Sequence, residues 1–442
     1  MITGFSVSNF KAIKKTAEIN IKPITIICGK NSSGKSSLIQ SLLLLKQTLD
    51  APRINAVEMS LEGEYLHYAH LSDIAHGLPQ PNSAKIEYRF FVQPDKMPSG
   101  YFGIVFRQSG RVKKSKKGPY VSEMYWGNKD IGHKQIKLEN DKLKIGSKVF
   151  LDLINEDKSS TYKLPAELTL FRFLPEAILV ETDKGKNRFV GVETSKAIMV
   201  YAKELFHFIN QIRYLSPLRA VPQRAYLQFS SQDEDIAIDG SNSAMYLWHN
   251  KDKKVAFAGE SKPLLVAVNE CLKAIGLDQE ISVKRTNRIL YQLTARLPGS
   301  SKKMVPISDV GFGYSQILPM IIRGLSVRGD ILTIYEQPEI HLHPSSAGKI
   351  ADVLFIFAKD GRRSIVETHS ADLINKLRLR IVENNELSKL VNVVFIEPDS
   401  TGDVNIRQFE FNEDGMPPDW PDGFLDESQK IAEQIILARL NK

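Results

Sequence analysis

Apolar and polar positions alternate along the first part of this chain in the pattern of half-buried strands. Residues 2–10 and 17–22 follow a two-residue period, which is typical of antiparallel pairs. Residues 24–28, Ile-Thr-Ile-Ile-Cys, form a short apolar run that predicts a buried strand. Leucines then recur at helical spacing, as Leu38, Leu42, Leu45 and Leu49. The start of the chain therefore predicts paired strands, followed by a strand, a loop and a helix.

From residue 305 onward, short apolar runs take turns with helical patterns. Strands are predicted at 331–335, 364–367 and 391–396, and helices at 345–358 and 371–382. Alternation of this kind predicts parallel strands with helices packed on their faces. After a turn at 416–423, the pattern predicts an amphipathic helix that ends at Leu440.

The middle of the chain keeps neither pattern for long. Short strand-like pieces at 57–95, including 86–92, lead into a stretch at 96–165 that is rich in Gly, Lys, Ser and Asn. The other predicted elements are a strand segment around 142–150, helices at 194–213 and 261–276, and two strands within 280–297. We therefore predict three parts, at 1–95, 96–300 and 301–442, of which the middle one is a mixed α/β insertion.

Composition excludes several classes of protein and leaves DNA open as a partner. Hydrophobic residues make up 42% of the chain and charged residues 25%, as in ordinary globular domains. No apolar run is long enough to span a membrane, and the N-terminus lacks the layout of a signal peptide. Two cysteines, Cys28 and Cys271, fit a reducing cytoplasm better than a disulfide framework. The net charge of +8 is compatible with nucleic acid, whereas the basic run at 107–117 is typical of a solvated loop.

The predicted strand and helix near the N-terminus flank a complete phosphate-binding motif. Residues 29–36, Gly-Lys-Asn-Ser-Ser-Gly-Lys-Ser, fit G-x-x-x-x-G-K-[ST] at every fixed position. In such a loop, backbone N–H groups and the helix N-terminus face phosphate oxygens, because partial positive charge accumulates there. Lys35 is expected to reach the β- and γ-phosphates, and Ser36 to hold Mg²⁺ through its hydroxyl. The sequence thus predicts a nucleoside triphosphate site, whose other candidate residues are Gly29, Asn31, Ser32, Gly34 and Ser37.

Three weaker signals follow one another in the last part of the chain. Residues 311–316, Gly-Phe-Gly-Tyr-Ser-Gln, are a glycine turn that opens an apolar helix. The apolar run at 331–335 ends in Glu336, and a carboxylate at this place can complete the Mg²⁺ shell. His369 lies just past another buried strand. Together they predict a second phosphate cradle, with the candidates Gly311, Gly313, Ser315 and Gln316, beside a metal-holding acid.

These segments resemble the ABC-type ATPase heads of the SMC, RecF and OLD-like group. Residues 29–36 resemble the Walker A loop, 311–316 the divergent signature motif, and 331–336 the Walker B strand, with Glu336 in place of the usual Asp. Residues 339–344, Glu-Ile-His-Leu-His-Pro, resemble the segment that follows Walker B in OLD-like ATPases, and His369 resembles the switch histidine. The resemblance covers about residues 1–95 and 300–442. It implies an α/β fold: an ABC-type P-loop ATPase head, with helices on a mixed sheet, interrupted by an α+β insertion.

The resemblance also implies ATP and Mg²⁺ as cofactors and a second copy of this chain as a partner. In ABC-type heads the signature motif of one copy caps the nucleotide held by the other, in a head-to-tail dimer or a larger oligomer. Asp399 and Asp403 are too few to form the metal site of a Toprim nuclease. The chain therefore resembles ATPase subunits that control a separate nuclease or toxin, as in the Septu and PARIS anti-phage systems. A DNA-binding ATPase of the RecF or SMC kind, acting in DNA repair, is the alternative.

One position departs from the pattern of this group. After the Walker B acid the group has a Glu that polarises the attacking water, whereas this chain has Gln337. A Gln orients water but cannot take its proton, so hydrolysis is slow and gated, or Glu339 or Glu367 supplies the carboxylate. The candidate catalytic residues are Glu336, Gln337, Glu339 and His369. His341 and His343 also form an H-x-H pair, but a third metal ligand is missing nearby in the sequence, which favours ordinary histidines.

Overall fold

A computed structural model describes most of the chain, and its internal contacts divide it into two compact units. The first unit comprises Met1–Ile21, Ser32–Ile212 and Glu397–Ile406, and the second comprises Lys22–Asn31, Arg213–Ile396 and Arg407–Lys442. The described residues are 1–51, 58–108, 118–139, 142–145, 153, 162–171, 174–182, 185–192, 195–227, 235–296, 303–399, 403–419, 424–425 and 427–440. The division into parts at 1–95, 96–300 and 301–442 stays a prediction.

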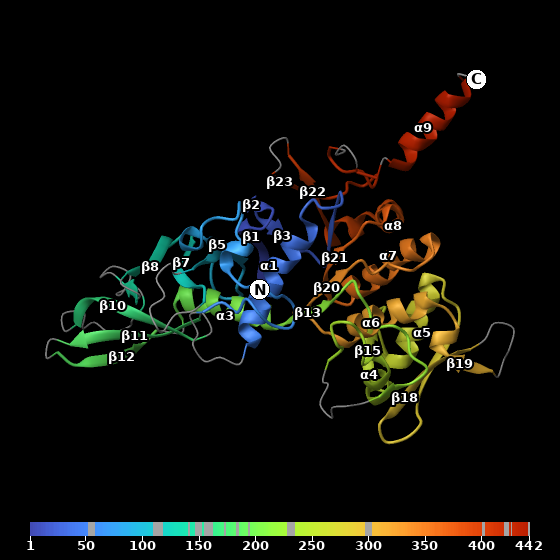
Figure 1. The fold of residues 1–442 in the computed structure, drawn as a ribbon, viewed down its shortest axis with the longest axis horizontal. Helices are drawn as coiled ribbons and strands as arrows, with labels where there is room; N and C mark the ends of the chain where they lie inside the picture. Colours follow the sequence, from blue (N-terminus) through green and yellow to red (C-terminus); the bar gives the residue numbers. More distant parts are fainter. Residues whose placement is uncertain are drawn as a thin grey trace. The chain divides into compact units, whose positions relative to one another are not determined.

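The first unit is built on an eleven-stranded antiparallel sheet, in which most strands pair with their neighbours in sequence (Figure 1). The order is β12-β11-β10-β9-β8-β7-β6-β5-β1-β2, and β3 also pairs with β1. The strands are β1 Ile2–Phe10, β2 Ile13–Lys15, β3 Ile19–Asn20, β5 Lys85–Val92, β6 Gly100–Arg107, β7 Tyr120–Asn128, β8 Gly132–Glu139, β9 Lys142–Ile145, β10 Tyr162–Phe171, β11 Leu174–Thr182 and β12 Asn187–Gly191. The strands predicted at 2–10 and 86–92 are therefore confirmed.

Two helices cover one face of this sheet. They are α1 Lys35–Asp50 and α3 Ala197–Asn210, and they contact each other as well as β1, β5 and β6. Strand β5 alternates as its sequence predicts, because every second side chain is buried. The ring of Phe90 on β5 meets that of Phe208 on α3, with centroids 6.2 Å apart. The helices predicted after the phosphate-binding motif and within 194–213 are confirmed.

The second unit contains a sheet whose central strands are parallel. The order of this six-stranded sheet is β13-β20-β21-β4-β22-β23. Its strands are β4 Ile24–Gly29, β13 Ile212–Leu215, β20 Leu332–Glu336, β21 Arg363–Glu367, β22 Val391–Pro398 and β23 Val404–Phe409. Strands β20, β21, β4 and β22 pair in parallel, and β20 and β21 are buried at every residue. Continuous apolar runs form such strands because helices cover both faces of a parallel sheet.

The helices and smaller sheets of the second unit share one hydrophobic core with these strands. Ile26 of β4, Val268 of α5, Ile321 of α6 and Leu354 of α7 belong to it. The remaining elements of this unit are α4 Ser243–Asn250, α5 Leu264–Ile275, α6 Phe312–Ser326, α7 Pro344–Lys359, α8 Ala371–Glu383, β14 Tyr226–Leu227, β15 Lys254–Phe257, β16 Glu260–Pro263, β17 Ile281–Arg285, β18 Leu290–Arg296, β19 Met304–Pro306 and α9 Glu427–Leu440. The parallel α/β arrangement predicted after residue 305 is confirmed.

The last helix corrects one prediction. Helix α9 exists, but its apolar residues do not share one face, because Ile435, Ile436 and Leu437 follow one another and successive positions point about 100° apart. Ile431, Ile435, Ile436 and Leu437 are all about half exposed. The expected amphipathic pattern is therefore wrong. Of the helices in the described part of the chain, none is long and apolar enough to cross a membrane.

Candidate functional site

The candidate site lies where parallel strands of the second unit end together. Glu336, the last residue of β20, is in register with Glu367 at the end of β21, and Glu367 is in register with Ile27 of β4. The turns that follow are tied to this edge, because the Gln337 N–H donates to the Glu367 carbonyl (2.8 Å) and the Thr368 N–H to the Ile27 carbonyl (3.0 Å). The predicted Walker A strand and Walker B acid thus end at one edge of the sheet.

The loop after β4 begins with a glycine that no other residue can replace without strain. Gly29 has φ +144°, and a Cβ built there would lie 1.9 Å from the carbonyl oxygen of Ile396 on β22. The loop continues through Ser32 (φ +60°) and Gly34 (φ +96°) to Lys35, where α1 begins. The strand, loop and helix predicted around residues 29–36 are therefore confirmed.

The start of α1 has the properties of a phosphate-binding terminus. Within the described residues no side chain caps it, and its first turn has no acidic residue. Its positive dipole end is therefore available to an anion. Lys35 is 4% exposed, and the buried hydroxyl of Ser33 has no hydrogen-bond partner in the described part of the chain. Ser36 and Ser37 lie in the first turn, and the Ser37 N–H donates to the Gly34 carbonyl.

Two buried carboxylates meet at the end of β20 and β21. Glu336 is 7% exposed and Glu367 is 3% exposed. Burial, followed by the nearby charge of Glu367, raises the pKa of Glu336 to about 7. The Tyr214 hydroxyl donates to Glu336 Oε1 (2.9 Å), which opposes this rise. Such a pair needs a cation or a proton to be stable, because two adjacent buried negative charges are costly.

A buried arginine, Arg219, supports the backbone at Glu336. Arg219 donates to the carbonyl oxygen of Glu336 (3.2 Å) and to that of Pro217 (2.9 Å). Burial lowers the pKa of Arg219 to about 10, while Tyr214, Glu336 and Glu339 act against this lowering. Neither Tyr214 nor Arg219 was predicted as a site residue. The local signal was a tyrosine and an arginine flanking a Ser-Pro pair, with the tyrosine inside the short strand β13.

The turn after β20 has residues with left-handed backbone, and its carboxylate bonds to the residues just after β21. Gln337 has φ +45° and His341 φ +64°, a region that residues other than glycine rarely adopt. Glu339 Oε1 accepts hydrogen bonds from the Thr368 hydroxyl (2.6 Å) and the His369 N–H (3.0 Å). Its second oxygen, Oε2, is buried and has no partner among the described residues. The predicted candidates Glu336, Gln337, Glu339 and His369 thus lie together.

The glycine turn before α6 packs on the same loop. Gly311 has φ +141° and precedes Phe312, whose ring meets the edge of His341 at 4.9 Å between centroids. A Cβ at Gly313 would lie 3.0 Å from Leu342 Cδ2 and 3.3 Å from the carbonyl of His341. The Ser315 hydroxyl donates to the Phe312 carbonyl (2.7 Å), and Gln316 is buried. The segment predicted as a second phosphate cradle thus forms the first turn of α6, and phosphate binding there stays a prediction.

The two histidines after Walker B have structural partners. His343 precedes α7, and its Nδ1 accepts from the Ser345 N–H (3.3 Å), while His341 contacts Phe312. Among the described residues, no three side chains of His, Cys, Asp or Glu are grouped as a metal site would require. Of the segment 399–403, Asp399 and Asp403 are described, and the Asp403 N–H donates to Asp399 Oδ1 (2.9 Å). Most of the basic run at 107–117 lies outside the described residues.

Comparisons with known proteins point to one family. The family described as "AAA ATPase domain" matches residues 1–216 and 251–374. The crystal structure of an SMC head bound to the C-winged helix domain of ScpA is similar at 12% identity, with 92% of this chain and 97% of that chain covered and a TM-score of 0.42. The SMC head domain from Thermotoga maritima (9% identity, 92% and 98% covered, TM-score 0.39) and an SMC head from Pyrococcus furiosus bound to the C-terminal domain of ScpA (10%, 98% and 99%, 0.42) are also similar. None of the curated proteins matches this chain.

Proposed function

Because this chain belongs to the AAA ATPase domain family, we propose that it is an ATP-operated switch that hydrolyses ATP slowly and controls a separate protein. The observation that carries this proposal is Gln337. It stands directly after the Walker B acid, where a general base is expected, and its amide cannot accept a proton. Its left-handed backbone and its N–H bond to Glu367 give it a fixed place in the turn. ATPase activity follows from the family, and the slow turnover is our inference.

We assign the binding of ATP·Mg²⁺ to the phosphate-binding loop that follows β4 and to Glu336 at the end of β20. Phosphate oxygens accept from backbone N–H groups of the loop and of the uncapped start of α1, and Lys35 pairs with the β- and γ-phosphates. By the resemblance to Walker A and Walker B, Ser36 and Glu336 are the residues that would hold Mg²⁺, and the ion would supply positive charge beside the phosphates. The residues fit this task, because two acids are buried side by side at the strand ends and Ser33 has a buried hydroxyl without a described partner. The loop residues that contact the nucleotide are Gly29, Asn31, Ser32, Gly34 and Ser37.

Of the two acids that could replace the missing base, Glu339 is better suited than Glu367. Glu367 is almost completely buried directly beside Glu336, and a second negative charge next to that carboxylate is unfavourable. Glu339 is half-buried, and only one of its oxygens is committed to Thr368 and His369. We propose that its Oε2, together with the Gln337 amide and His369, orients the attacking water. Because the Gln337 amide cannot take a proton from this water, turnover is slow.

A second copy of the chain completes the site in this proposal. Gly311, Gly313, Ser315 and Gln316 of one copy would cap the nucleotide held by the other, because the first turn of α6 lacks a described side-chain cap. ATP would close such a head-to-tail dimer through its γ-phosphate, which ADP lacks.

The dimer is tested with two variants and one control. Lys35→Ala is expected to abolish ATP binding, whereas Ser315→Arg binds ATP but stays monomeric in light scattering. The control is Ser83→Arg, since the hydroxyls of Ser83 and Ser315 both donate to the carbonyl three residues earlier. The control should dimerise with ATP like the wild type. ATP-dependent dimerisation of Ser315→Arg would disprove the head-to-tail arrangement.

Tyr214 is expected to position the Walker B acid. Tyr214→Phe removes the hydroxyl that donates to Glu336, and a hydrogen bond to a carboxylate is worth about 1.5–3 kcal/mol. We therefore expect ATP turnover to fall about tenfold in steady-state assays, with little change in ATP affinity. The matched control is Tyr226→Phe, whose hydroxyl accepts a hydrogen bond from the backbone N–H of Gln223 (3.3 Å). Equal rates for the two variants would remove Tyr214 from the mechanism.

We further propose that the controlled protein is a nuclease or toxin acting in anti-phage defence, as the resemblance to Septu and PARIS subunits suggests. Co-purification from the native host, with ATP and with the Lys35→Ala variant, tests this. A small effector that is retained only by the wild type is expected.

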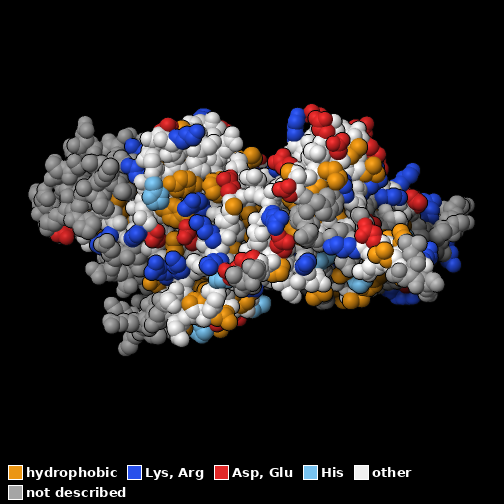
Figure 2. All heavy atoms as spheres, turned by 90° about the horizontal axis from the view of Figure 1, so that it is seen from above, with side chains coloured by type: hydrophobic (Ala, Val, Ile, Leu, Met, Phe, Trp, Pro, Cys, Tyr) orange, Lys and Arg blue, Asp and Glu red, His pale blue; other side chains and the backbone are white. Residues whose placement is uncertain are grey.

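The alternative, a DNA-binding repair ATPase, is favoured by the net charge of +8. On the face drawn in Figure 2, lysine and arginine side chains lie scattered among acidic ones, not in a single patch. DNA binding with a steep dependence on salt concentration would favour the alternative over the effector.

A further inference from the structure

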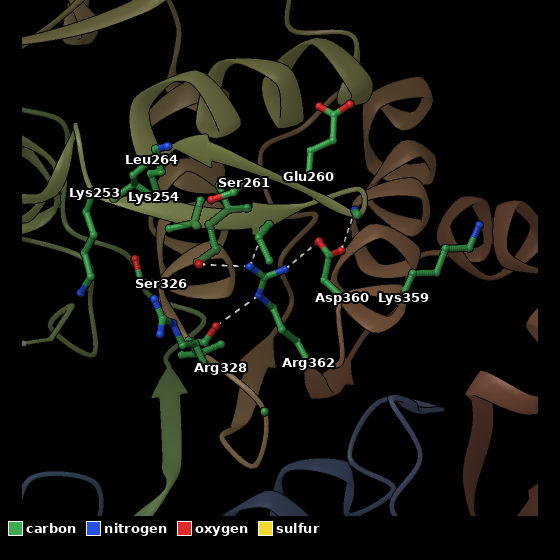
Figure 3. Close-up of a pocket in the computed structure, with 16 residues that line it drawn as sticks. Lys253, Lys254, Glu260, Ser261, Leu264, Ser326, Arg328, Lys359, Asp360 and Arg362 are labelled. Atoms are coloured by element: carbon green, nitrogen blue, oxygen red, sulfur yellow. Dashed lines mark hydrogen bonds and ion pairs between the residues drawn. The ribbon is translucent and has the colours of Figure 1, made fainter.

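A second pocket lies at the opposite end of β20 and β21 from Glu336 and Glu367. Its volume is about 570 Å³, and it is lined by the β15–β16 hairpin, by residues 325–329 at and just after the end of α6, and by the end of α7 (Figure 3). Residues 328–329 precede β20 and Arg362 precedes β21, so the pocket is at the amino ends of these parallel strands. Since a five-residue strand spans about 13 Å, the pocket is distinct from the edge that carries Glu336.

The frame of this pocket is fixed by a buried ion pair. Arg362 donates to the carbonyl oxygens of Val327 (3.2 Å), Leu325 (3.2 Å) and Ala256 (2.6 Å) and to Asp360 (3.1 Å). Asp360 also accepts from the backbone N–H groups of Ala258 and Gly259 at the hairpin tip, both at 3.0 Å. The side chains of Arg362 and Asp360 are each only 4% exposed. These bonds hold hairpin, α6 and α7 together, so the pocket exists before any ligand arrives.

The charges that remain around the pocket are positive. Its acidic side chains are both paired, since Asp360 meets Arg362 and Glu260 meets Lys262 (3.2 Å). Four exposed basic residues of the lining form no ion pair with any described residue, namely Lys253, Lys254, Arg328 and Lys359. In Figure 3, Lys253 and Arg328 lie toward the same side of the pocket, whereas Glu260 and Lys359 point away from its centre. An excess of cations in a concave site attracts an anion.

We propose that this pocket binds a small ligand that carries phosphate groups, with Lys253 and Arg328 as its main contacts. The volume suits a molecule of about the size of a mononucleotide. Arg328 can engage two phosphate oxygens through its planar guanidinium, and Lys253 adds a compact charge. A nucleic-acid strand would need a longer basic track with aromatic rings for stacking, and neither lines this pocket. The site is separate from the proposed ATP site and does not depend on it.

The test uses tripolyphosphate as the probe, titrated into the full chain by calorimetry. The Lys35→Ala background weakens binding at the phosphate loop, so that the second site is measured. On this background, Lys253→Glu with Arg328→Glu is compared with Lys284→Glu and Arg288→Glu, which reverse the same charges at exposed positions away from the pocket. We expect one binding event per chain that weakens about tenfold or more in the pocket variant and persists in the control.

Two results would overturn this proposal. Equal tripolyphosphate affinity of the pocket variant and the control would show that Lys253 and Arg328 hold no phosphate. Binding of a single-stranded oligonucleotide that depends on these two residues, without binding of tripolyphosphate, would make the pocket a contact for nucleic acid. Thermal unfolding of both variants, with midpoints near that of the background, confirms that the comparison is between folded proteins.

Discussion

Replacing Glu336 by Gln is expected to lower ATP hydrolysis about a hundredfold or more while ATP still binds. The carboxylate is the acid that we assign to Mg²⁺, and loss of one such charge-stabilising group typically costs about a factor of 100 to 1,000. The change is nearly isosteric, and Gln Oε1 can still accept from the Tyr214 hydroxyl. Single-turnover hydrolysis and binding of a fluorescent ATP analogue separate the two effects.

The same substitution is expected to make the nucleotide-free protein more stable at pH 8. Folding raises the pKa of Glu336 from 4.5 to about 7, so the protonated form is favoured in the folded state. The folded protein therefore loses stability as the pH rises through this interval, and the full loss is present above pH 7. Gln carries no charge and avoids it, so we expect a gain of about 1–3 kcal/mol at pH 8 and little at pH 4.5. Thermal unfolding without Mg²⁺ measures this.

The matched control for Glu336 is Glu386→Gln, an exposed acid in the same unit. It should change neither hydrolysis nor stability by a measurable amount. If the Glu336→Gln variant hydrolyses ATP at the wild-type rate, Glu336 is not the Walker B acid of this chain. If it is less stable at pH 8, the buried carboxylate is already neutralised by groups other than Mg²⁺.

Gly29→Ala is expected to destabilise the protein by about 3–5 kcal/mol, enough to make much of it insoluble. The new Cβ would lie 1.9 Å from the Ile396 carbonyl oxygen, and the backbone has φ +144°. Both strands concerned are buried in the sheet centre, so neither can move away without breaking the ladder. Soluble yield and the midpoint of thermal unfolding report the loss.

The control for Gly29 separates the clash from the backbone conformation. Gly361 also has positive φ, at +81°, but a Cβ there meets nothing within 4 Å. Gly361→Ala should therefore cost only about 1 kcal/mol, the usual penalty for a left-handed residue with a side chain. Similar losses in the two variants would mean that β22 accommodates the methyl group beside Gly29.

The elements of the ATPase head could be predicted because their signals are local. The run at 24–28, the glycine loop and the leucines of α1 adjoin one another, and the strands after residue 305 are short, apolar and separated by helices. Such patterns report on burial directly. The parallel arrangement of these strands followed from them.

The groups that hold Glu336 could not be predicted in the same way. Tyr214 is 122 positions from Glu336 along the chain, and Arg219 is 117, so their contacts exist only after folding. The left-handed backbone at Gln337 also gives no sign in the sequence, because glutamine has no preference for it. Helix α9 was predicted to be amphipathic, which the spacing of its isoleucines does not support.

The loop of residues 337–343 contacts both the turn after β21 and the start of α6. Through Glu339 it is bonded to Thr368 and His369, and through His341 and Leu342 it contacts Gly313 at the start of α6. Because these contacts are short and direct, a shift at one end of the loop is expected to shift the other end as well. Docking of a second copy on α6 would therefore change the position of His369. Loss of a phosphate near Glu336 would change the surface on which the second copy docks. The rate of ATP turnover and the association with the second copy would then both depend on the position of this loop.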